Sequence, residues 1–327
     1  MIRILLISIV LIGLTSCGKE EGKRFEHAGG TLTFSLDNEP STYITRNVMD
    51  YYSATVLSQI TEGLVGIDPK TIQIIPKIAE KWSISENGKV YTFTLRENVL
   101  FHPHDIFSSK ADRVVTVQDV VKSIELGCSK DQRGVACSAY SYAYKGNLKG
   151  ADEFFSGQTK KISGLRTKGN QVILELVQED HNFLYKLANV NSSIVSRKII
   201  ESDNETDVIG TGPFIYNKHI DGEVPKLILT RNDDYYLKDK EGNALPYLDS
   251  LVFIFESMKL EQLDMFESGV SDLIIGLPTS RITAMLDGRL PDFNSKPPLF
   301  ELANNPLLES NFYFFNLKDE RFKDPRV

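Results

Sequence analysis

Residues 251–275 read LVFIFESMKLEQLDMFESGVSDLII, and they set the fold class of the chain. The two ends of this stretch, residues 251–255 and 273–275, are short apolar runs typical of buried strands. Between them Lys259–Glu267 is predicted as a helix that ends before Gly269. A strand, a helix and a second strand in this order form a βαβ unit, which predicts a parallel sheet within an α/β fold.

The N-terminal part of the chain predicts one strand and one helix. Thr31–Leu36 alternates polar and apolar residues and runs into a turn at residues 37–40, which favours a strand. Apolar residues then recur at every fourth position before Gly63. This spacing predicts an amphipathic helix that includes Val48, Tyr52, Val56 and Ile60.

The middle of the chain adds a hairpin and a capped helix. The pair Asn87 and Gly88 lies between residues 82–85 and 89–96, which predicts a β-hairpin. Residues 116–119 (TVQD) have the pattern of a capping box that opens a helix. Because these elements do not alternate regularly, this region is predicted to be of mixed α+β type.

The composition is that of a folded protein and excludes several classes. Of 327 residues, 41% are hydrophobic and 25% are charged, so disorder throughout and a protein with many membrane spans are excluded. With 37 basic and 44 acidic residues the formal net charge is -7, which argues against a protein that tracks nucleic-acid phosphates. We therefore expect no nucleic acid among its partners.

The first 30 residues predict export and anchoring. The apolar run at residues 4–14 follows Arg3 and is too short for a membrane span, so residues 1–16 are interpreted as a signal peptide. Residues 14–17 (LTSC) resemble the lipobox of bacterial lipoproteins, in which the cysteine, here Cys17, is acylated. Residues 17–30 are then a flexible tether. The mature protein is expected in the cell envelope, extracytoplasmic and lipid-anchored, on the periplasmic side where there are two membranes.

Two further cysteines, Cys128 and Cys137, would then lie in an oxidising compartment, where a disulfide between them is allowed. Two buried free thiols are the alternative, and the sequence leaves both open. Their spacing does not suit zinc, and no pair of His or Cys residues lies nearby to complete four ligands.

Several short blocks follow one another along the chain in a characteristic order. They are IAEKW (78–82), NGK (87–89), YTFTLR (91–96), VLFH (99–102), TVQDVVKS (116–123), GTGPF (210–214), LTRNDDYY (229–236), LPYLD (245–249), FESG (266–269), Asn316 and FKDPRV (322–327). In this order they resemble the family 5 extracellular solute-binding proteins, the peptide- and nickel-type receptors of ABC importers. Each block alone is a weak signal, but their order over nearly all of the mature chain is a strong one.

The resemblance implies a two-lobed, periplasmic-binding-protein-like fold with a hinge, in which the lobes enclose a ligand. The first lobe would consist of residues 31–60 and 190–247, with a family-specific subdomain, residues 61–189, inserted into it. The second lobe would begin at residue 248 and be incomplete at residue 327, because family members normally continue beyond this point. The chain is therefore expected to be a part of a longer receptor or a truncated product.

No pattern in the sequence points to a catalytic or a metal site. Gly210 and Gly212 lack the third glycine and the lysine of nucleotide-binding loops, so residues 210–213 are interpreted as the entry turn of a strand. His102 and His104 would point to opposite faces of a strand, and the family uses the first of them structurally. The nucleophile motifs of hydrolases and the His-Glu-x-x-His motif are absent. We expect neither cofactor, metal nor catalysis.

The resemblance also indicates candidate ligand-binding residues. The turn after the first strand, with Glu39, Pro40 and Ser41, borders the cleft in the family. Phe266, together with Phe312 and Tyr313 on a late strand, matches positions that approach the ligand in peptide binders. The alternative is that these three aromatic side chains pack in the core.

Together these observations favour a lipid-anchored, monomeric receptor that binds a small solute, expected to be a short peptide. It would deliver that solute to an ABC permease and ATPase through closure of its two lobes. Two alternatives come from other classes: a secreted lipoprotein hydrolase, and a binding-protein-like sensor or scaffold without a transporter. Nickel chelates, oligosaccharides and opines are the other ligands that the resemblance leaves open.

Overall fold

A computed structural model describes residues 28–202, 208–303, 314–316 and 318–322. The chain forms two compact units, residues 1–276 and residues 277–327. The expected signal peptide, most of the tether with Cys17, and the candidate residues Phe312 and Tyr313 lie outside the described residues. Among the residues that are described, no helix is long and apolar enough to cross a membrane.

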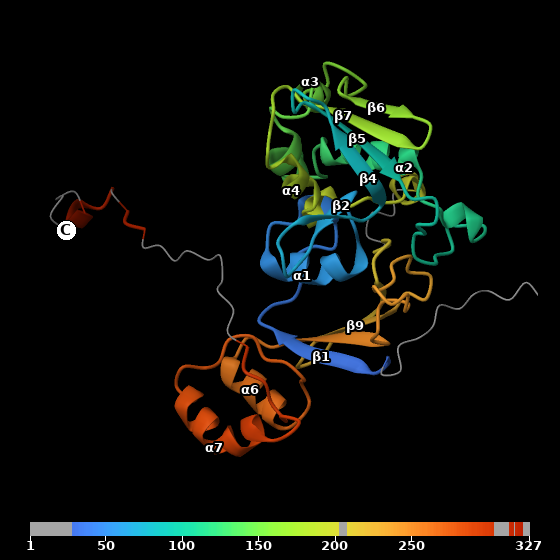
Figure 1. The fold of residues 1–327 in the computed structure, drawn as a ribbon. Helices are drawn as coiled ribbons and strands as arrows, with labels where there is room; N and C mark the ends of the chain where they lie inside the picture. The colour runs from blue at the N-terminus through green and yellow to red at the C-terminus, as the bar shows by residue number, and fades with distance from the viewer. Residues whose placement is uncertain (1–27, 203–207, 304–313, 317, 323–327) are drawn as a thin grey trace, which may run out of the picture. The chain divides into compact units, whose positions relative to one another are not determined.

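The first unit combines β-strands with α-helices and shorter turns of helix (Figure 1). Its strands are β1 (Thr31–Leu36), β2 (Val65–Ile67), β3 (Ile74–Pro76), β4 (Ala79–Ile84), β5 (Val90–Leu95), β6 (Leu165–Lys168), β7 (Gln171–Glu175), β8 (Phe214–Ile220), β9 (Lys226–Arg231) and β10 (Ser250–Phe255). Its α-helices are α1 (Tyr51–Ile60), α2 (Val117–Gly127), α3 (Ala151–Phe155), α4 (Phe183–Leu187), α5 (Arg197–Glu201) and α6 (Lys259–Glu267). The short helical turns are η1 (Thr45–Asn47), η2 (Ala111–Arg113), η3 (Tyr140–Tyr144) and η4 (Val190–Ser192).

The predicted βαβ unit belongs to a four-stranded sheet with the order β1-β10-β9-β8. β1 and β10 run parallel, with Thr31 opposite Ser250 and Leu36 opposite Phe255. After α6 the chain returns beside β1, where Leu273 forms a parallel bridge with Phe34. The topology of the prediction is therefore confirmed, although a single bridge replaces the expected strand at residues 273–275.

The strand that follows residue 248 belongs to this same sheet. β10 is hydrogen-bonded to both β1 and β9, and its Leu251 and Phe253 are buried in one core with Leu227 and Leu229 of β9. The expected start of the second lobe at residue 248 stays a prediction.

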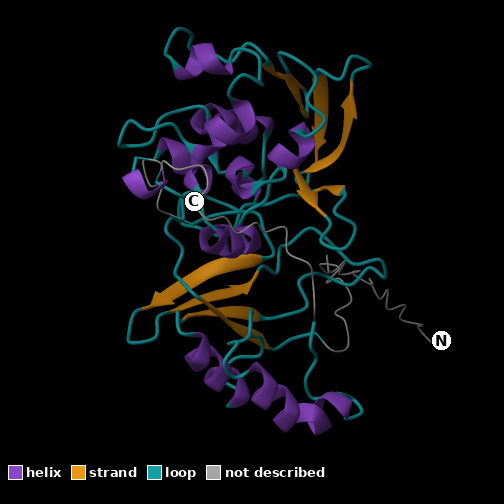
Figure 2. Cartoon of the chain, turned by 90° about the vertical axis from the view of Figure 1, so that its left-hand side faces the viewer, coloured by secondary structure: helices purple, strands orange, loops and turns teal. Residues whose placement is uncertain are grey.

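Helix α1 packs its apolar side on the same sheet. Val56, Leu57 and Ile60 are fully buried in the core that contains the sheet residues. The helix begins at Tyr51 and not near Val48, because the Asp50 carboxylate accepts the Ser53 N–H at 2.8 Å and so caps the first turn. Figures 1 and 2 show α1 between this sheet and the second four-stranded sheet of the unit.

The second sheet has the order β4-β5-β7-β6 and is antiparallel throughout. The predicted hairpin is confirmed: β4 and β5 are joined by a turn in which Gly88 has φ 67°, a value that favours glycine. The predicted capping box is confirmed as well. The Thr116 hydroxyl accepts the Asp119 N–H at 3.4 Å, and the Asp119 carboxylate accepts the Thr116 N–H at 2.8 Å, at the start of α2.

The core under the second sheet extends further along the chain than the expected subdomain, residues 61–189. Phe93, Val172 and Ile124 lie in this core, and Ile194 and Ile209 belong to it too. Val190 and Val208 pack instead against the core beside the first sheet, so the segment between α4 and β8 contacts both cores.

Cys128 and Cys137 are both buried, and no disulfide joins them. In this structure they are two buried free thiols, and the disulfide between them stays a prediction. Burial raises the pKa of the Cys128 thiol well above its usual value, so this side chain is a protonated core residue at neutral pH.

The described part of the second unit contains α7 (Ile282–Asn294) and the short turn η5 (Glu320–Phe322). Met285 of α7 is buried. The rings of Phe293 and Phe300 lie 6.1 Å apart, and the Arg289 guanidinium lies 5.5 Å from the centre of the Phe300 ring. These contacts attach the segment after α7 to the helix.

Candidate functional site

A groove of about 780 Å³ lies on the first unit beside the start of α1. Its lining comes from three segments that are far apart in the sequence, within residues 48–54, 135–142 and 189–191, and we call it the α1 groove. Two further hollows among the described residues hold only about 30 and 150 Å³. The volume of the α1 groove falls within the range of about 300–1,000 Å³ that is typical of small-molecule sites.

Large apolar side chains of the α1 groove are exposed to solvent. Met49 is 89% exposed, Tyr51 60%, Val135 54% and Tyr142 48%. Burying apolar surface stabilises a complex by about 25 cal/mol per Å², and contiguous exposed apolar patches mark binding sites. The groove is therefore suited to cover the apolar part of a ligand.

Asp50 is the one titratable acid or base, apart from tyrosine, in the lining of the α1 groove. Partial burial raises the pKa of its carboxyl group, but hydrogen bonds from Ser41 and Ser53 outweigh this and hold the pKa below its usual value. The Ser41 hydroxyl donates at 2.6 Å and the Ser53 hydroxyl at 2.7 Å. The groove therefore has a fixed negative charge on its wall at neutral pH.

The α1 groove lies where the two cores of the first unit meet, and side-chain hydrogen bonds join them. The Asn191 side chain donates to the Val48 carbonyl at 2.6 Å, which links the third lining segment to the first. Elsewhere along the contact between the cores, the hydroxyls of Thr61 and Ser193 lie 3.0 Å apart in a buried contact. The bond from Asn191 holds the first and third lining segments of the groove together.

The predicted turn residues Glu39, Pro40 and Ser41 lie next to this site. Ser41 bonds directly to Asp50 of the groove wall. Glu39 is exposed and its carboxylate lies 3.1 Å from Nε2 of His219, near the end of β8, while Pro40 between them is partly buried. The structure therefore brings one of the three predicted residues into contact with the groove.

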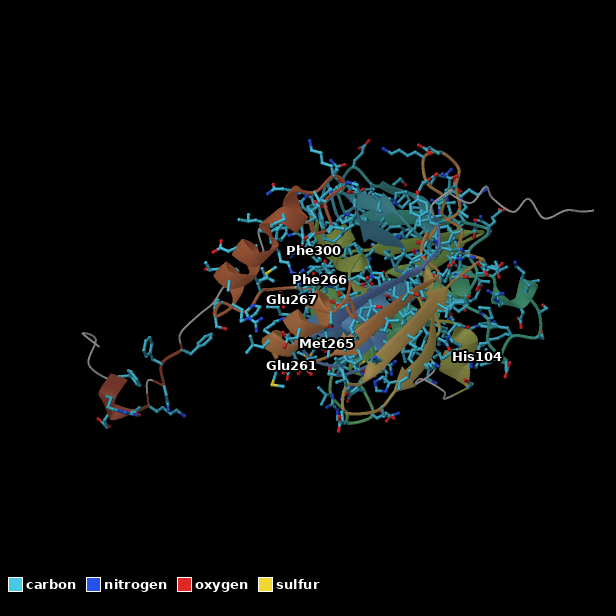
Figure 3. All side chains as sticks on the ribbon, turned by 90° about the horizontal axis from the view of Figure 1, so that it is seen from below. His104, Glu261, Met265, Phe266, Glu267 and Phe300 are labelled. Atoms are coloured by element: carbon cyan, nitrogen blue, oxygen red, sulfur yellow. The ribbon has the colours of Figure 1, made fainter. Side chains whose placement is uncertain are left out.

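Phe266, the remaining predicted residue that the structure describes, lies elsewhere, on α6 (Figure 3). Its side chain is partly buried. The start of α6 is attached to the end of β1, because Lys259 and the buried Gln262 both donate to Asp37, at 2.5 and 2.8 Å. Phe266 is therefore held near the first lobe's sheet, and it is not among the residues that line the α1 groove.

The glycine-bearing turn at residues 210–213 has a structural role. His102 is 1% exposed, and its ring bonds this turn: Nδ1 accepts the Gly210 N–H at 3.3 Å, and Nε2 lies 3.0 Å from the Gly212 carbonyl. Burial, with a smaller contribution from Arg113, lowers the pKa of His102 from 6.5 to about 4, against the opposing effect of the Gly212 bond. The neutral ring is therefore part of the fold, and both nitrogens are occupied by backbone groups.

This arrangement predicts a pH dependence of stability. The unfolded chain takes up a proton on His102 near pH 6.5, whereas the folded chain does so only near pH 4, so the free energy of unfolding should fall as the pH falls through this interval. The contribution of His102 is roughly 3 kcal/mol at the acid end. Urea unfolding at several pH values measures it. His102→Gln should flatten this dependence, whereas His181→Gln, at a side chain that is 87% exposed, should leave it unchanged.

A buried carboxylate, Glu62, connects the inserted subdomain to the first lobe. The residue is 6% exposed, and Lys77 donates to it at 3.0 Å. The hydroxyls of Tyr235 and Thr211 donate to the same carboxylate, at 2.7 and 3.1 Å. Burial, reinforced by the charge of Glu62, raises the pKa of Tyr235, which therefore remains a hydrogen-bond donor.

Within the ranges that the structure describes, no group of three or more His, Cys, Asp or Glu side chains is placed to hold a metal ion. His104, whose Nδ1 accepts the Ile106 N–H at 3.2 Å, lies on the opposite side of the first unit from α6 (Figure 3). The lining of the α1 groove combines apolar side chains with hydroxyl and amide groups and a single carboxylate.

Sequence reasoning missed the α1 groove because its three lining segments come together only in the folded chain. Tyr51 and Met49 lie next to the periodic positions of the helix and carry no signal of their own. The one usable signal was the concentration of Ser and Tyr at residues 138–144.

Comparison with known proteins gives a consistent result. Residues 73–327 match the family model "Bacterial extracellular solute-binding proteins, family 5 Middle". The chain is 23% identical over 282 residues to "Probable ABC transporter periplasmic-binding protein SapA" of Escherichia coli, covering 84% of this chain and 47% of that protein. It is 27% identical over 340 residues to "Dipeptide-binding protein DppE" of Bacillus subtilis, covering 98% of this chain and 55% of that protein.

The fold agrees with these sequence matches. The structure of the periplasmic binding protein DppA of Helicobacter pylori, in complex with the peptide STSA, superposes with a TM-score of 0.65 at 24% identity. The match covers 81% of this chain and 50% of that chain. The chain therefore has the mixed helix-and-sheet fold of these binding proteins and spans about half the length of the proteins that it matches.

Proposed function

The chain belongs to the bacterial extracellular solute-binding proteins of family 5, and from this premise we propose that it works as a receptor for short peptides. The receptor binds its ligand outside the cytoplasm, between two lobes, and delivers it to an ABC permease and ATPase. The observation that carries this proposal is the match of residues 73–327 to the family, and it agrees with relatives that are named as a peptide transport protein and as dipeptide-binding proteins.

The α1 groove supports this proposal from the geometry. It combines apolar side chains with the hydroxyl and amide groups of Ser138, Ser141 and Asn189. A peptide presents the same mixture, since its backbone needs hydrogen bonds and its side chains need cover. No step of the proposed function breaks or forms a covalent bond.

Release and capture would follow from closure of the lobes. A ligand that touches both lobes favours the closed state only by the difference between its affinities for the closed and the open state. The attachment of α6 to β1 through Asp37 and Lys259 lies just after β10, where the chain leaves the first lobe's sheet, and it is a suitable position for the hinge.

The proposal includes a lipid anchor. The sequence LTSC at residues 14–17 supports acylation of Cys17, and the polar residues up to position 30 give the receptor a tether of limited reach. The mature receptor then works as a monomer held at a membrane of the cell envelope.

Native mass spectrometry of the protein, purified gently from its own host, tests this function. The folded protein is expected to carry extra mass equal to that of a peptide of a few residues, and denaturation should release this mass. A digest of the same sample should contain an N-terminal peptide that begins at acylated Cys17.

A folded protein without bound mass, which also gains none when pools of di- to pentapeptides are added, would contradict the receptor. Turnover of peptides or glycosides by the same sample, lost on alanine substitution of its acids, would indicate a secreted hydrolase instead.

A further inference from the structure

We propose that the α1 groove binds a large uncharged apolar side chain of the peptide ligand and disfavours an acidic one. This inference rests on the proposed function and names the ligand class that this receptor selects. Four observations carry it: the exposed apolar residues, the single charge, the fixed walls and the unused hydroxyl groups.

The apolar residues surround the groove on more than one side. Met49 and Tyr51 come from the segment before and at the start of α1, whereas Val135 and Tyr142 come from the inserted subdomain. All four are exposed by 48% or more, although Met and Val are residue types that are usually buried. A side chain that fits between the two segments would remove both sets of residues from water at once.

The charge of the groove is of one sign. Asp50 is ionised, its carboxylate is held in place by Ser41 and Ser53, and no lysine, arginine or histidine of the described part of the chain lines the groove. A ligand carboxylate would lose water there, would meet a like charge and would find no cation. A neutral side chain avoids all three costs, and a cationic one is attracted to Asp50.

Two of the three lining segments do not have to form around the ligand. The bond from Asn191 to the Val48 carbonyl and the cap of α1 by Asp50 hold these two segments in place. Preorganised walls reduce the entropy lost on binding, so differences between ligand side chains should appear directly in the affinity.

Polar groups are available for the ligand backbone. Among the described residues, the hydroxyl groups of Ser138 and Ser141 make no side-chain hydrogen bond, and both lie at the groove. They are therefore free to bond the peptide groups on either side of the apolar side chain.

The test uses alanine tripeptides in which each position in turn is Phe, Leu, Lys or Glu, with affinities measured by isothermal titration calorimetry on the full chain. At one position of the peptide, Phe and Leu should bind at least tenfold more tightly than Ala, and Glu should bind more weakly than Ala. Lys at this position should bind at least as well as Ala.

Two variants connect this preference to the groove. Tyr142→Ala should reduce the advantage of Phe severalfold, and Met49→Lys should increase the affinity for the Glu peptide severalfold. Ile84→Lys is the matched control, because Ile84 is 46% exposed on β4 and is not part of the lining. Circular dichroism of each variant checks that it is folded.

The outcomes separate this inference from the function on which it rests. If no peptide binds at all, the receptor function fails and this inference fails with it. If peptides bind with equal affinity whatever the side chain, or if both groove variants behave like Ile84→Lys, the inference is overturned and the receptor function stands. Groove variants that behave like Ile84→Lys would also be expected if the groove served as a contact for another protein.

Discussion

Replacement of Gly210 by alanine is expected to destabilise the first unit by about 3 kcal/mol or more. A Cβ atom at this position would lie 2.0 Å from the Ile60 carbonyl oxygen, 2.7 Å from the Ile60 carbonyl carbon and 2.8 Å from Cα of Thr61. All three are backbone atoms at the end of α1, so no side chain can rotate away. The turn would have to leave the helix, and the bond from its Gly212 N–H to the Ile60 carbonyl, 2.9 Å long, would be lost with it.

Gly222→Ala is the matched control for this experiment. A Cβ at Gly222 meets nothing within 4 Å, so this variant should unfold within about 0.5 kcal/mol of the unmodified protein. Urea unfolding followed by circular dichroism measures both variants. An unfolding midpoint of Gly210→Ala equal to that of the control would show that the turn does not pack against α1 as described.

The second large effect is expected at Glu62. Glu62→Ala removes the acceptor of two hydroxyl groups, those of Tyr235 and Thr211, and the ion partner of Lys77. Buried donors without acceptors and a partly buried unpaired charge together should cost about 3 kcal/mol of the free energy of unfolding. The Lys77 side chain is 23% exposed, so it retains some of its hydration. The loss of stability therefore stays below the upper end of the range for breaking a fully buried ion pair.

Glu86→Ala serves as the control, because Glu86 is an exposed residue of the β4–β5 turn. Its stability should match that of the unmodified protein. The double variant Glu62→Leu with Lys77→Met should lose less stability than the sum of its single substitutions, since it removes both charges together. Additive losses would contradict a direct coupling between the two side chains.

The elements that the sequence predicts best are those whose cause is local. The β4–β5 hairpin follows from Asn87 and Gly88, and the start of α2 follows from Thr116 and Asp119, three positions apart in a single turn. The start of α1 was predicted too early. The apolar period includes Val48, but the N-cap at Asp50 makes Tyr51 the first residue of the helix. Periodicity reports which residues face a core, and capping decides where the helix begins.

The candidate site is formed by contacts between residues that are far apart in the sequence. Ser41 was assigned to the cleft by resemblance, and the structure joins it to the groove through Asp50. Tyr142, Val135 and Asn191 were not predicted, since each is close to the site only after two separate cores have formed and met. Such a groove is a property of tertiary packing, so a single sequence gives no measure of it.

The parallel pairing of β1 with β10 has a consequence for the order in which the protein is made. Thr31 bonds Ser250, a residue 219 positions later, so the first strand to leave the ribosome has no neighbour in its sheet until nearly the whole unit exists. At about 5–20 residues per second this delay lasts between about 10 and 40 s. All four strands of the β4-β5-β7-β6 sheet are synthesised within this interval, so that sheet can form before the one that contains β1. The strand with the lowest residue numbers is therefore among the last to find its partner.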